Sequence, residues 1–242
     1  MSRNNSNQVS DFFAASSRDV TPVSVSHVAD VLYAPVSHDP EVTRRCTLVL
    51  SDTELQRADR FVTQEDKTLF IQRRAFRRYC GALAHESSQS LSQMSFIETE
   101  NGRPRLPDLP DYWFSFSSCR FGFVAAWSST HGIGVDVEDH TRGLQATELA
   151  QQFFSTAEAR AVDGSSGLES RQTFFKFWCL KEAALKSIGE GLPFGLDSFE
   201  FELEPNLRVV DAPPEHGGAE QFDARLIETT DSYTALLIRN LA

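Results

Sequence analysis

The sequence predicts an α+β fold because two helical segments and several short strands follow one another without regular alternation. Apolar residues recur at helical spacing from Leu69 to Leu83 and in a longer helix from about Arg171 to Ser187. Runs rich in Val, Ile, Phe and Tyr lie around these helices and are typical of strands. A doubly wound parallel sheet is therefore the less favoured alternative.

Local signals place the elements in order along the chain. Helices are expected to begin at Thr63, whose spacing from Asp66 is typical of a capping box, and at Ser155, while the longer helix ends at Gly189. Strands are expected over the segments 25–36, 113–117, 121–128, 133–138, 199–203 and 233–240. A strand and a loop are expected between the last two segments.

The length and composition predict a packed protein of two halves. With 242 residues, 40% hydrophobic content and 19 Phe, the chain can form a core, which excludes a disordered or fibrous protein. Each half offers a strand, helices and then a pair of strands. We therefore expect a flexible tail over 1–26, an N-terminal half over 27–130, and a C-terminal half over 131–242 that carries the metal site, with a cleft between the halves.

Charge and cysteine usage narrow the class of protein. With 34 acidic and 23 basic residues the formal net charge is -11, which argues against nucleic acid as a partner. The four cysteines, Cys46, Cys80, Cys119 and Cys179, lie far apart and form neither a zinc nor a disulfide framework. No secretory signal opens the sequence and no apolar run approaches the roughly 20 residues of a membrane span. We expect a cytoplasmic protein with no membrane partner.

An acidic strand is the first candidate site. In the segment GIGVDVE (132–138), Val135 and Val137 point to one face while Asp136 and Glu138 point to the other. Two carboxylates about 7 Å apart on one strand face can converge on a hard cation such as Mg²⁺ or Mn²⁺. The alternative is a half-buried strand whose polar face meets water, and the spacing alone is compatible with both.

A helical motif, WCLKEAALK (178–186), is the second candidate site. Trp178, Glu182 and Lys186 recur every four residues and share one helix face. Alone, this pattern is typical of an amphipathic helix with a surface pair between Glu182 and Lys186. Combined with the acidic strand, Glu182 could supply a third carboxylate, and Lys181 and Lys186 could supply cations beside a bound phosphate.

Together the two motifs resemble the paired signature of the 4'-phosphopantetheinyl transferases. The segment GVDVE (134–138) is followed, 40 residues after Glu138, by WCLKEAALK, and the length resembles the surfactin-type, pseudo-dimeric branch. Weaker similarities cover ELQRADRF (54–61), the turn Gly102-Arg103-Pro104 and the segment FSTAE (154–158). The resemblance implies two similar α/β halves related by a pseudo-twofold, with the active cleft between them.

The resemblance also implies an activity. The family transfers the 4'-phosphopantetheine arm of coenzyme A to a serine of an acyl or peptidyl carrier protein, depends on Mg²⁺ (Mn²⁺ is possible), and releases 3',5'-ADP. We therefore expect a monomeric transferase that docks its carrier near Ile188, Leu192 and Phe194. Two alternatives stay open: a module that binds coenzyme A or a carrier without transfer, and a Mg²⁺-dependent pyrophosphate hydrolase.

The resemblance assigns roles to individual residues. Glu182, or a metal-bound water, would accept the proton of the carrier serine, and Lys186 would neutralise or protonate the departing phosphate. Ser118 stands where the family usually has a histidine that contacts a coenzyme phosphate. The implied metal ligands are Asp136, Glu138 and Glu182. The implied contacts to coenzyme A are Arg57, Arg74, Arg103, Ser117, Ser118, Asp136, Lys181 and Lys186.

Overall fold

A computed structural model of the chain describes residues 21–22, 28–85, 90–228 and 231–241. Of the tail expected over residues 1–26, only Thr21–Pro22 is described, as the short strand β1, and the rest of that prediction lies outside the described residues.

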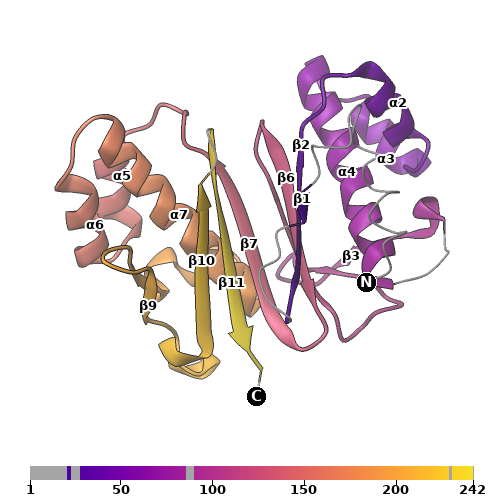
Figure 1. Cartoon of the computed structure of the whole chain (residues 1–242). Coiled ribbons are helices and arrows are strands. Elements are labelled where there is room, and N and C mark those ends of the chain that lie inside the picture. The colour runs from indigo at the N-terminus through magenta and orange to yellow at the C-terminus, as the bar shows by residue number, and fades with distance from the viewer. Residues whose placement is uncertain (1–20, 23–27, 86–89, 229–230, 242) are drawn as a thin grey trace.

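Two antiparallel sheets lie in the middle of the molecule (Figure 1). The first has the strand order β1 (Thr21–Pro22), β2 (Asp30–Pro35), β6 (Gly122–Ser128) and β5 (Trp113–Ser118). The second has the order β10 (Phe222–Glu228), β11 (Ser232–Asn240) and β7 (His131–Asp139). Two short hairpins accompany them, β3 (Ile97–Glu98) with β4 (Pro104–Arg105), and β8 (Glu200–Glu202) with β9 (Arg208–Asp211).

Two groups of helices flank the strands on opposite sides (Figure 1). The N-terminal group consists of α2 (Pro40–Thr47), α3 (Asp52–Ala58) and α4 (Gln64–His85). The C-terminal group consists of α5 (Ala146–Phe153), α6 (Thr156–Asp163) and α7 (Leu168–Ile188). Short 3₁₀ turns are η1 (Leu91–Gln93), η2 (Leu192–Phe194), η3 (Leu196–Ser198), η4 (Pro214–His216) and η5 (Ala219–Gln221). The mixed arrangement confirms the α+β class.

The helix ends follow the capping signals in the sequence. The Thr63 hydroxyl accepts from the backbone N–H of Asp66 at 3.0 Å, and helix α4 begins directly after it. Helix α6 begins with a complete capping box at Ser155. Helix α7 ends at Gly189, whose φ of 77° is the left-handed conformation typical of a helix C-terminus. It begins at Leu168, ahead of the expected Arg171.

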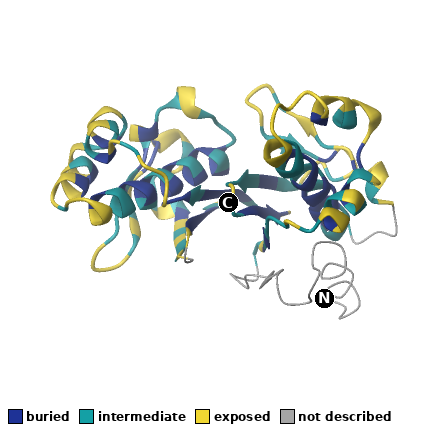
Figure 2. Cartoon of the chain, turned by 90° about the horizontal axis from the view of Figure 1, so that it is seen from above, coloured by how far each residue is buried: buried dark blue, intermediate teal, exposed yellow. Residues whose placement is uncertain are grey.

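The core has three parts (Figure 2 shows the buried residues in the strands and on the inner helix faces). One packs α4 against the first sheet, and another packs α7 against the second sheet. The third joins the two sheets, with Val124 and Ala126 of β6 buried among Ile133 and Val135 of β7 and Leu236 of β11. The strands of the two halves therefore share one apolar cluster.

No helix in the described part of the chain is long and apolar enough to span a membrane.

Candidate active site

Helix α7 lies directly on strand β7, backbone against backbone. A Cβ atom added at Gly134 would stand 1.7 Å from the carbonyl oxygen of Ala183, and one at Gly132 would stand 2.6 Å from that of Ser187. Both glycines are on one face of the strand, and α7 presents the small residues Cys179, Ala183 and Ser187 at intervals of four. The glycines of the acidic strand thus allow the two motifs to meet.

This packing brings the acidic strand next to Lys186 and Glu182 of the helical motif. Asp136 and Glu138 share the strand face of the two glycines, so they project toward α7. The Lys186 ammonium donates to Asp136 Oδ1 at 2.6 Å and lies 3.9 Å from Glu182 Oε2. One cation therefore lies between a strand carboxylate and a helix carboxylate that are 46 positions apart in the sequence, from 136 to 182.

Asp136 is the most enclosed of the three carboxylates, with 3% of the residue exposed. Its Oδ1 accepts from Lys186 and also from the Ser117 hydroxyl at 2.7 Å. Its Oδ2 is buried and has no hydrogen-bond partner in the described structure. A buried carboxylate oxygen without a partner is costly, so this atom is suited to a positively charged ligand.

Burial and neighbouring charge raise the pKa values of two of the carboxylates, Glu138 and Glu182. Burial, with the charge of Asp136, raises the pKa of Glu138 to about 7, although Arg142 lies 3.1 Å from its carboxylate and opposes the shift. Burial also raises the pKa of Glu182, against the pull of Lys186. For Lys186, burial disfavours the charge, but Asp136 and Glu182 outweigh it and raise the pKa of the ammonium. The site is short of positive charge.

The donor set fits a hard divalent cation in its chemistry. Three carboxylates offer the oxygen ligands that Mg²⁺ and Mn²⁺ prefer, and Asp136 Oδ2 is free of hydrogen bonds. Across the described ranges, no group of three His, Cys, Asp or Glu side chains is arranged closely enough to hold an ion. The Lys186 ammonium takes the place between Asp136 and Glu182 instead.

Strand β5 reaches the site through its serines. Ser115 accepts from the backbone N–H of Val135 at 3.0 Å, which ties β5 to β7, and Ser117 reaches Asp136. Ser118 is the last residue of β5 and is partly exposed beside Ser117. Arg120, in the turn that follows, lies 2.8 Å from the carboxylate of Asp139. Strand β5 thus supplies one hydroxyl group, that of Ser117, to the Asp136 carboxylate of β7.

The turn that contains Arg103 contacts the end of α7. The Arg103 guanidinium lies 3.9 Å from the ring centroid of Trp113, and its Cδ is 3.6 Å from the Cβ position of Gly189, the residue that caps α7. Next to it, Asn101 donates to the carboxylate of Glu190 at 3.0 Å. Arg103 is therefore positioned near the helix that carries Glu182 and Lys186.

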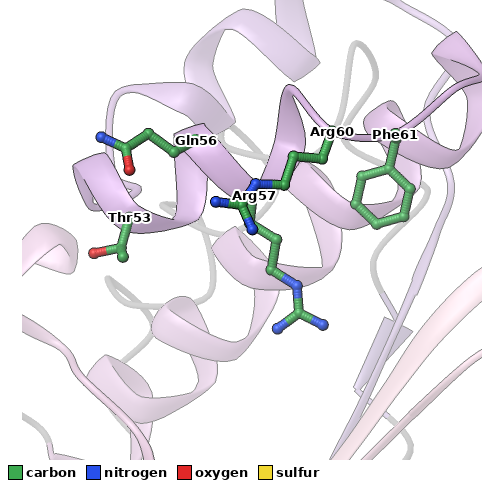
Figure 3. A pocket seen from close by; sticks show the side chains of 5 residues that line it. All are labelled: Thr53, Gln56, Arg57, Arg60 and Phe61. Carbon is green, nitrogen blue, oxygen red and sulfur yellow. The ribbon is translucent and has the colours of Figure 1, made fainter.

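Arg57 and Arg74 lie on the N-terminal helices α3 and α4, and both guanidinium groups lie over the ring of Phe70. Arg74 also lies 3.6 Å from Glu54. Among the described residues, no hydrogen bond or ion pair joins either arginine to the carboxylates of β7. Arg57 instead lines a hollow of about 440 Å³ whose other lining residues, seen in Figure 3, are Thr53, Gln56, Arg60 and Phe61.

Lys181 does not face the carboxylates, which corrects the expectation that it contacts coenzyme A. Its side chain is completely buried, and its ammonium is paired with Glu158 at 2.7 Å. The reason is helical geometry: residues five apart lie about 140° apart around a helix, whereas residues four apart lie about 40° apart. Lys186 therefore shares the face of Glu182, and Lys181 points into the core.

Sequence reasoning missed two partners in the site and one in the core. Nothing in the sequence pairs Arg142 with Glu138 or Asn101 with Glu190, because these contacts depend on how loops fold. The capping-box spacing of Glu158 from Ser155 predicts the start of a helix but not the buried pair that Glu158 forms with Lys181. The small residues at intervals of four in α7, opposite the alternate glycines of β7, are a signal that could have predicted the close packing.

Comparison with known proteins gives consistent matches. A family model described as the 4'-phosphopantetheinyl transferase superfamily matches residues 132–234. The 4'-phosphopantetheinyl transferase Sfp of Bacillus subtilis (strain 168) is 33% identical over 126 residues, 52% of this chain and 55% of that protein. The 4'-phosphopantetheinyl transferase ffp of Bacillus subtilis is 28% identical over 176 residues, 73% of this chain and 76% of that protein. A Synechocystis sp. relative, assigned to the same transferase class, is 30% identical over 178 residues, 72% of this chain and 70% of that protein.

Proposed function

The chain belongs to the 4'-phosphopantetheinyl transferase superfamily, and on this premise we propose that it transfers the 4'-phosphopantetheine arm of coenzyme A to a serine of an acyl or peptidyl carrier protein. The serine oxygen forms a bond to the phosphorus of the arm, the bridging P–O bond of the pyrophosphate breaks, and 3',5'-ADP leaves. The aligned part of the chain spans about half the length of the Sfp relative, so substrate and partner are inferred from the site.

One observation carries this proposal: Lys186 lies between Asp136 and Glu182, with Ser117 on the same Asp136 oxygen. A strand acid, a helix acid, a cation and a hydroxyl from the other half of the chain thus meet at one point. Phosphoryl transfer depends mainly on positioning and charge stabilisation, and this group of side chains can supply both.

The proton transfers are assigned to two side chains of α7. Glu182, or a water that it holds, accepts the proton of the carrier serine, and its raised pKa brings it closer to the working range of a general base. The Lys186 ammonium neutralises or protonates the departing phosphate. Its raised pKa keeps it charged at neutral pH.

We infer that Asp136, Glu138 and Glu182 hold Mg²⁺, with Mn²⁺ as a possible substitute. The ion, when bound, takes up negative charge on the pyrophosphate. The unpartnered Oδ2 of Asp136 and the raised pKa of Glu138 both support a cation at this position.

The remaining contacts to coenzyme A are proposed from position and charge. Ser117 donates to Asp136, Ser118 follows it at the end of β5, and Arg103 lies beside the end of α7. We assign these three residues to the diphosphate and nucleotide. Arg57 lines the hollow on α3 and is assigned to a more distant phosphate. Arg74 lies beside Arg57 on the Phe70 ring and is assigned with it.

We also propose that the enzyme acts as a monomer in the cytoplasm. Both halves of the site lie in one chain, joined by Ser117 and Asp136. The four cysteines are free, which suits a reducing compartment.

The test is incubation of the purified chain with coenzyme A, Mg²⁺ and a panel of apo carrier proteins. Mass spectrometry should show a carrier that gains the mass of one phosphopantetheine arm, together with 3',5'-ADP. Release of phosphopantetheine without a carrier would instead indicate a hydrolase, and binding of coenzyme A without any product would indicate a binding module.

Variants of the carboxylates make the test specific to the site. Glu138→Gln and Glu182→Gln should each abolish transfer while the circular dichroism spectrum is unchanged. Glu169→Gln is the matched control, because Glu169 is an exposed acid at the start of the same helix, α7. Full activity in both site variants would refute the metal assignment.

A further inference from the structure

We propose that Lys181 and Glu158 are positioning residues that fix the rotation of α7 and the path of the chain after it, so that Glu182 and Lys186 are held beside Asp136. This inference rests on the proposed function for its catalytic consequence, but its structural content can be measured without any substrate.

The Lys181 ammonium has all of its donors satisfied inside the protein. It is 2.7 Å from Glu158 Oε2, and it donates to the carbonyl oxygens of Leu196 at 2.9 Å and Phe199 at 2.5 Å. An ammonium has three N–H donors, so these three acceptors use all of them. With the side chain completely buried, no donor remains for a phosphate.

Glu158 is equally saturated. Its Oε1 accepts from the backbone N–H of Phe201 at 2.9 Å, and its Oε2 accepts from that of Ser155 at 2.9 Å in addition to Lys181. The Glu158 side chain is also completely buried. Two charged groups thus satisfy each other and four backbone groups.

The pair therefore joins four segments of the C-terminal half. Glu158 belongs to the first turn of α6 and Lys181 lies in the middle of α7. One backbone partner caps the start of α6, and the other three belong to η3, to β8 and to the residue between them. These segments lie on both sides of α7 in the sequence. Rotation or sliding of α7 would break several of these bonds at once.

Position along α7 connects the pair to the carboxylates. Lys181 immediately precedes Glu182, so whatever fixes the direction of Lys181 about the helix axis also fixes that of Glu182. Gly132 and Gly134 let α7 approach β7 closely on one side, and the buried pair anchors the helix on the other. A buried ion pair is weak evidence for stability in itself, because an apolar pair can serve as well, whereas its fixed bond directions favour one arrangement.

The main variant is the double substitution Lys181→Met with Glu158→Gln, which removes both charges together and leaves no buried charge unpaired. Lys181→Met and Glu158→Gln alone are made beside it. We expect faster amide hydrogen exchange in the last turns of α7 and in residues 189–203, and at least about tenfold weaker Mn²⁺ binding by calorimetry. With coenzyme A and a carrier, kcat should fall about 10- to 100-fold while KM for coenzyme A changes little.

The matched control is Val162→Ala, which removes buried apolar volume from the same helix as Glu158 but leaves the ion pair intact. All proteins are compared well below their melting temperatures. The control should have a lower melting temperature than the wild type but the same exchange rates in α7, the same Mn²⁺ affinity and the same kcat.

Wild-type exchange in the last turns of α7 in a folded double variant would overturn the proposal, whatever its kcat. Equal losses in Val162→Ala at a similar melting temperature would also overturn it, because the effect would then be general destabilisation. If the wild-type protein modifies no carrier, the proposed function fails, and the exchange measurement still decides whether the pair positions α7.

Discussion

Glu138 couples the candidate site to pH. Its pKa is raised to about 7 by burial and by Asp136, from an ordinary value of 4.5. The folded carboxyl therefore binds its proton more tightly than the unfolded one. This stabilisation is fully present below about pH 4.5 and is lost as the pH rises from 4.5 through 7.

We therefore predict that Glu138→Gln stabilises the metal-free protein at mildly alkaline pH, by on the order of 1–3 kcal/mol. The glutamine has the shape of the protonated acid and cannot acquire the charge. The measurement is the melting temperature of both proteins in chelator across the pH range. A gap between them that stays constant with pH would contradict the assignment of the titration to Glu138.

Lys186 compensates the two carboxylates beside it. Lys186→Met should lower the stability of the metal-free protein at neutral pH by about 1–3 kcal/mol, because Asp136 and Glu182 lose their nearest cation. Urea unfolding in chelator measures the loss.

The control for this change is Arg225→Met, which removes a surface cation that lies 3.3 Å from Asp223. Exposed pairs of this kind contribute about 0–1 kcal/mol. If both variants lost the same stability, Lys186 would be no more than another surface charge.

At the scale of elements, the packing of α7 on β7 requires glycines on the facing strand, and Gly134 is the tighter of the two contacts. Gly134→Ala would place a methyl group 1.7 Å from the Ala183 carbonyl oxygen, so strand and helix must separate. We predict a loss of more than about 3 kcal/mol, or failure to fold, measured by urea unfolding.

Gly143→Ala is the matched control for this prediction. A Cβ at Gly143 has no neighbour within 4 Å, and its substitution should change stability by less than about 1 kcal/mol. A mild effect at Gly134 would show that the helix does not lie where the structure places it.

The elements differ in how well the sequence predicts them. Helices α4 and α7 are long enough for apolar periodicity and carry end signals at Thr63 and Gly189. The shorter helices α2, α3 and α5 span only about two turns each, which is too short for a repeating pattern of apolar residues to indicate a helix. The sequence indicates only a strand and a loop where β10 lies, because this edge strand carries the exposed charges Asp223 and Arg225.

The site was predicted in part, for the same kind of reason. The alternation of β7 indicates that Asp136 and Glu138 share a face, and the interval of four in α7 groups Glu182 with Lys186. That strand and helix meet could be inferred only through the family resemblance, because proximity between distant segments is set by tertiary packing. Lys181 belongs to the same motif, but its direction about the helix axis differs from that of Lys186, so its side chain lies in the core.

For the whole molecule, the segment after α7 is the candidate surface for a carrier protein. Leu192 in η2 is 55% exposed, directly after the helix that carries Glu182 and Lys186. We predict that Leu192→Ala raises KM for the carrier several-fold and leaves KM for coenzyme A unchanged, because loss of a single exposed contact costs about 1–2 kcal/mol in binding.

Steady-state kinetics with each substrate varied in turn separates these two effects. Leu168→Ala is the control, because Leu168 has a similar exposure of 57% at the opposite end of α7. A parallel rise in both KM values for Leu192→Ala would argue against docking at η2.

The apolar cluster between β6, β7 and β11 bears on any attempt to divide the protein. Val124 and Leu236 are buried together although they belong to opposite halves. A fragment that ended near residue 130 would expose its share of this apolar cluster to water. The complementary fragment would expose the other share, so each fragment would be prone to aggregate. In chimaeras assembled from related enzymes, the apolar residues that the two halves contribute to this cluster would have to fit each other. Co-expression of both fragments offers a better route to a soluble split enzyme than either fragment alone.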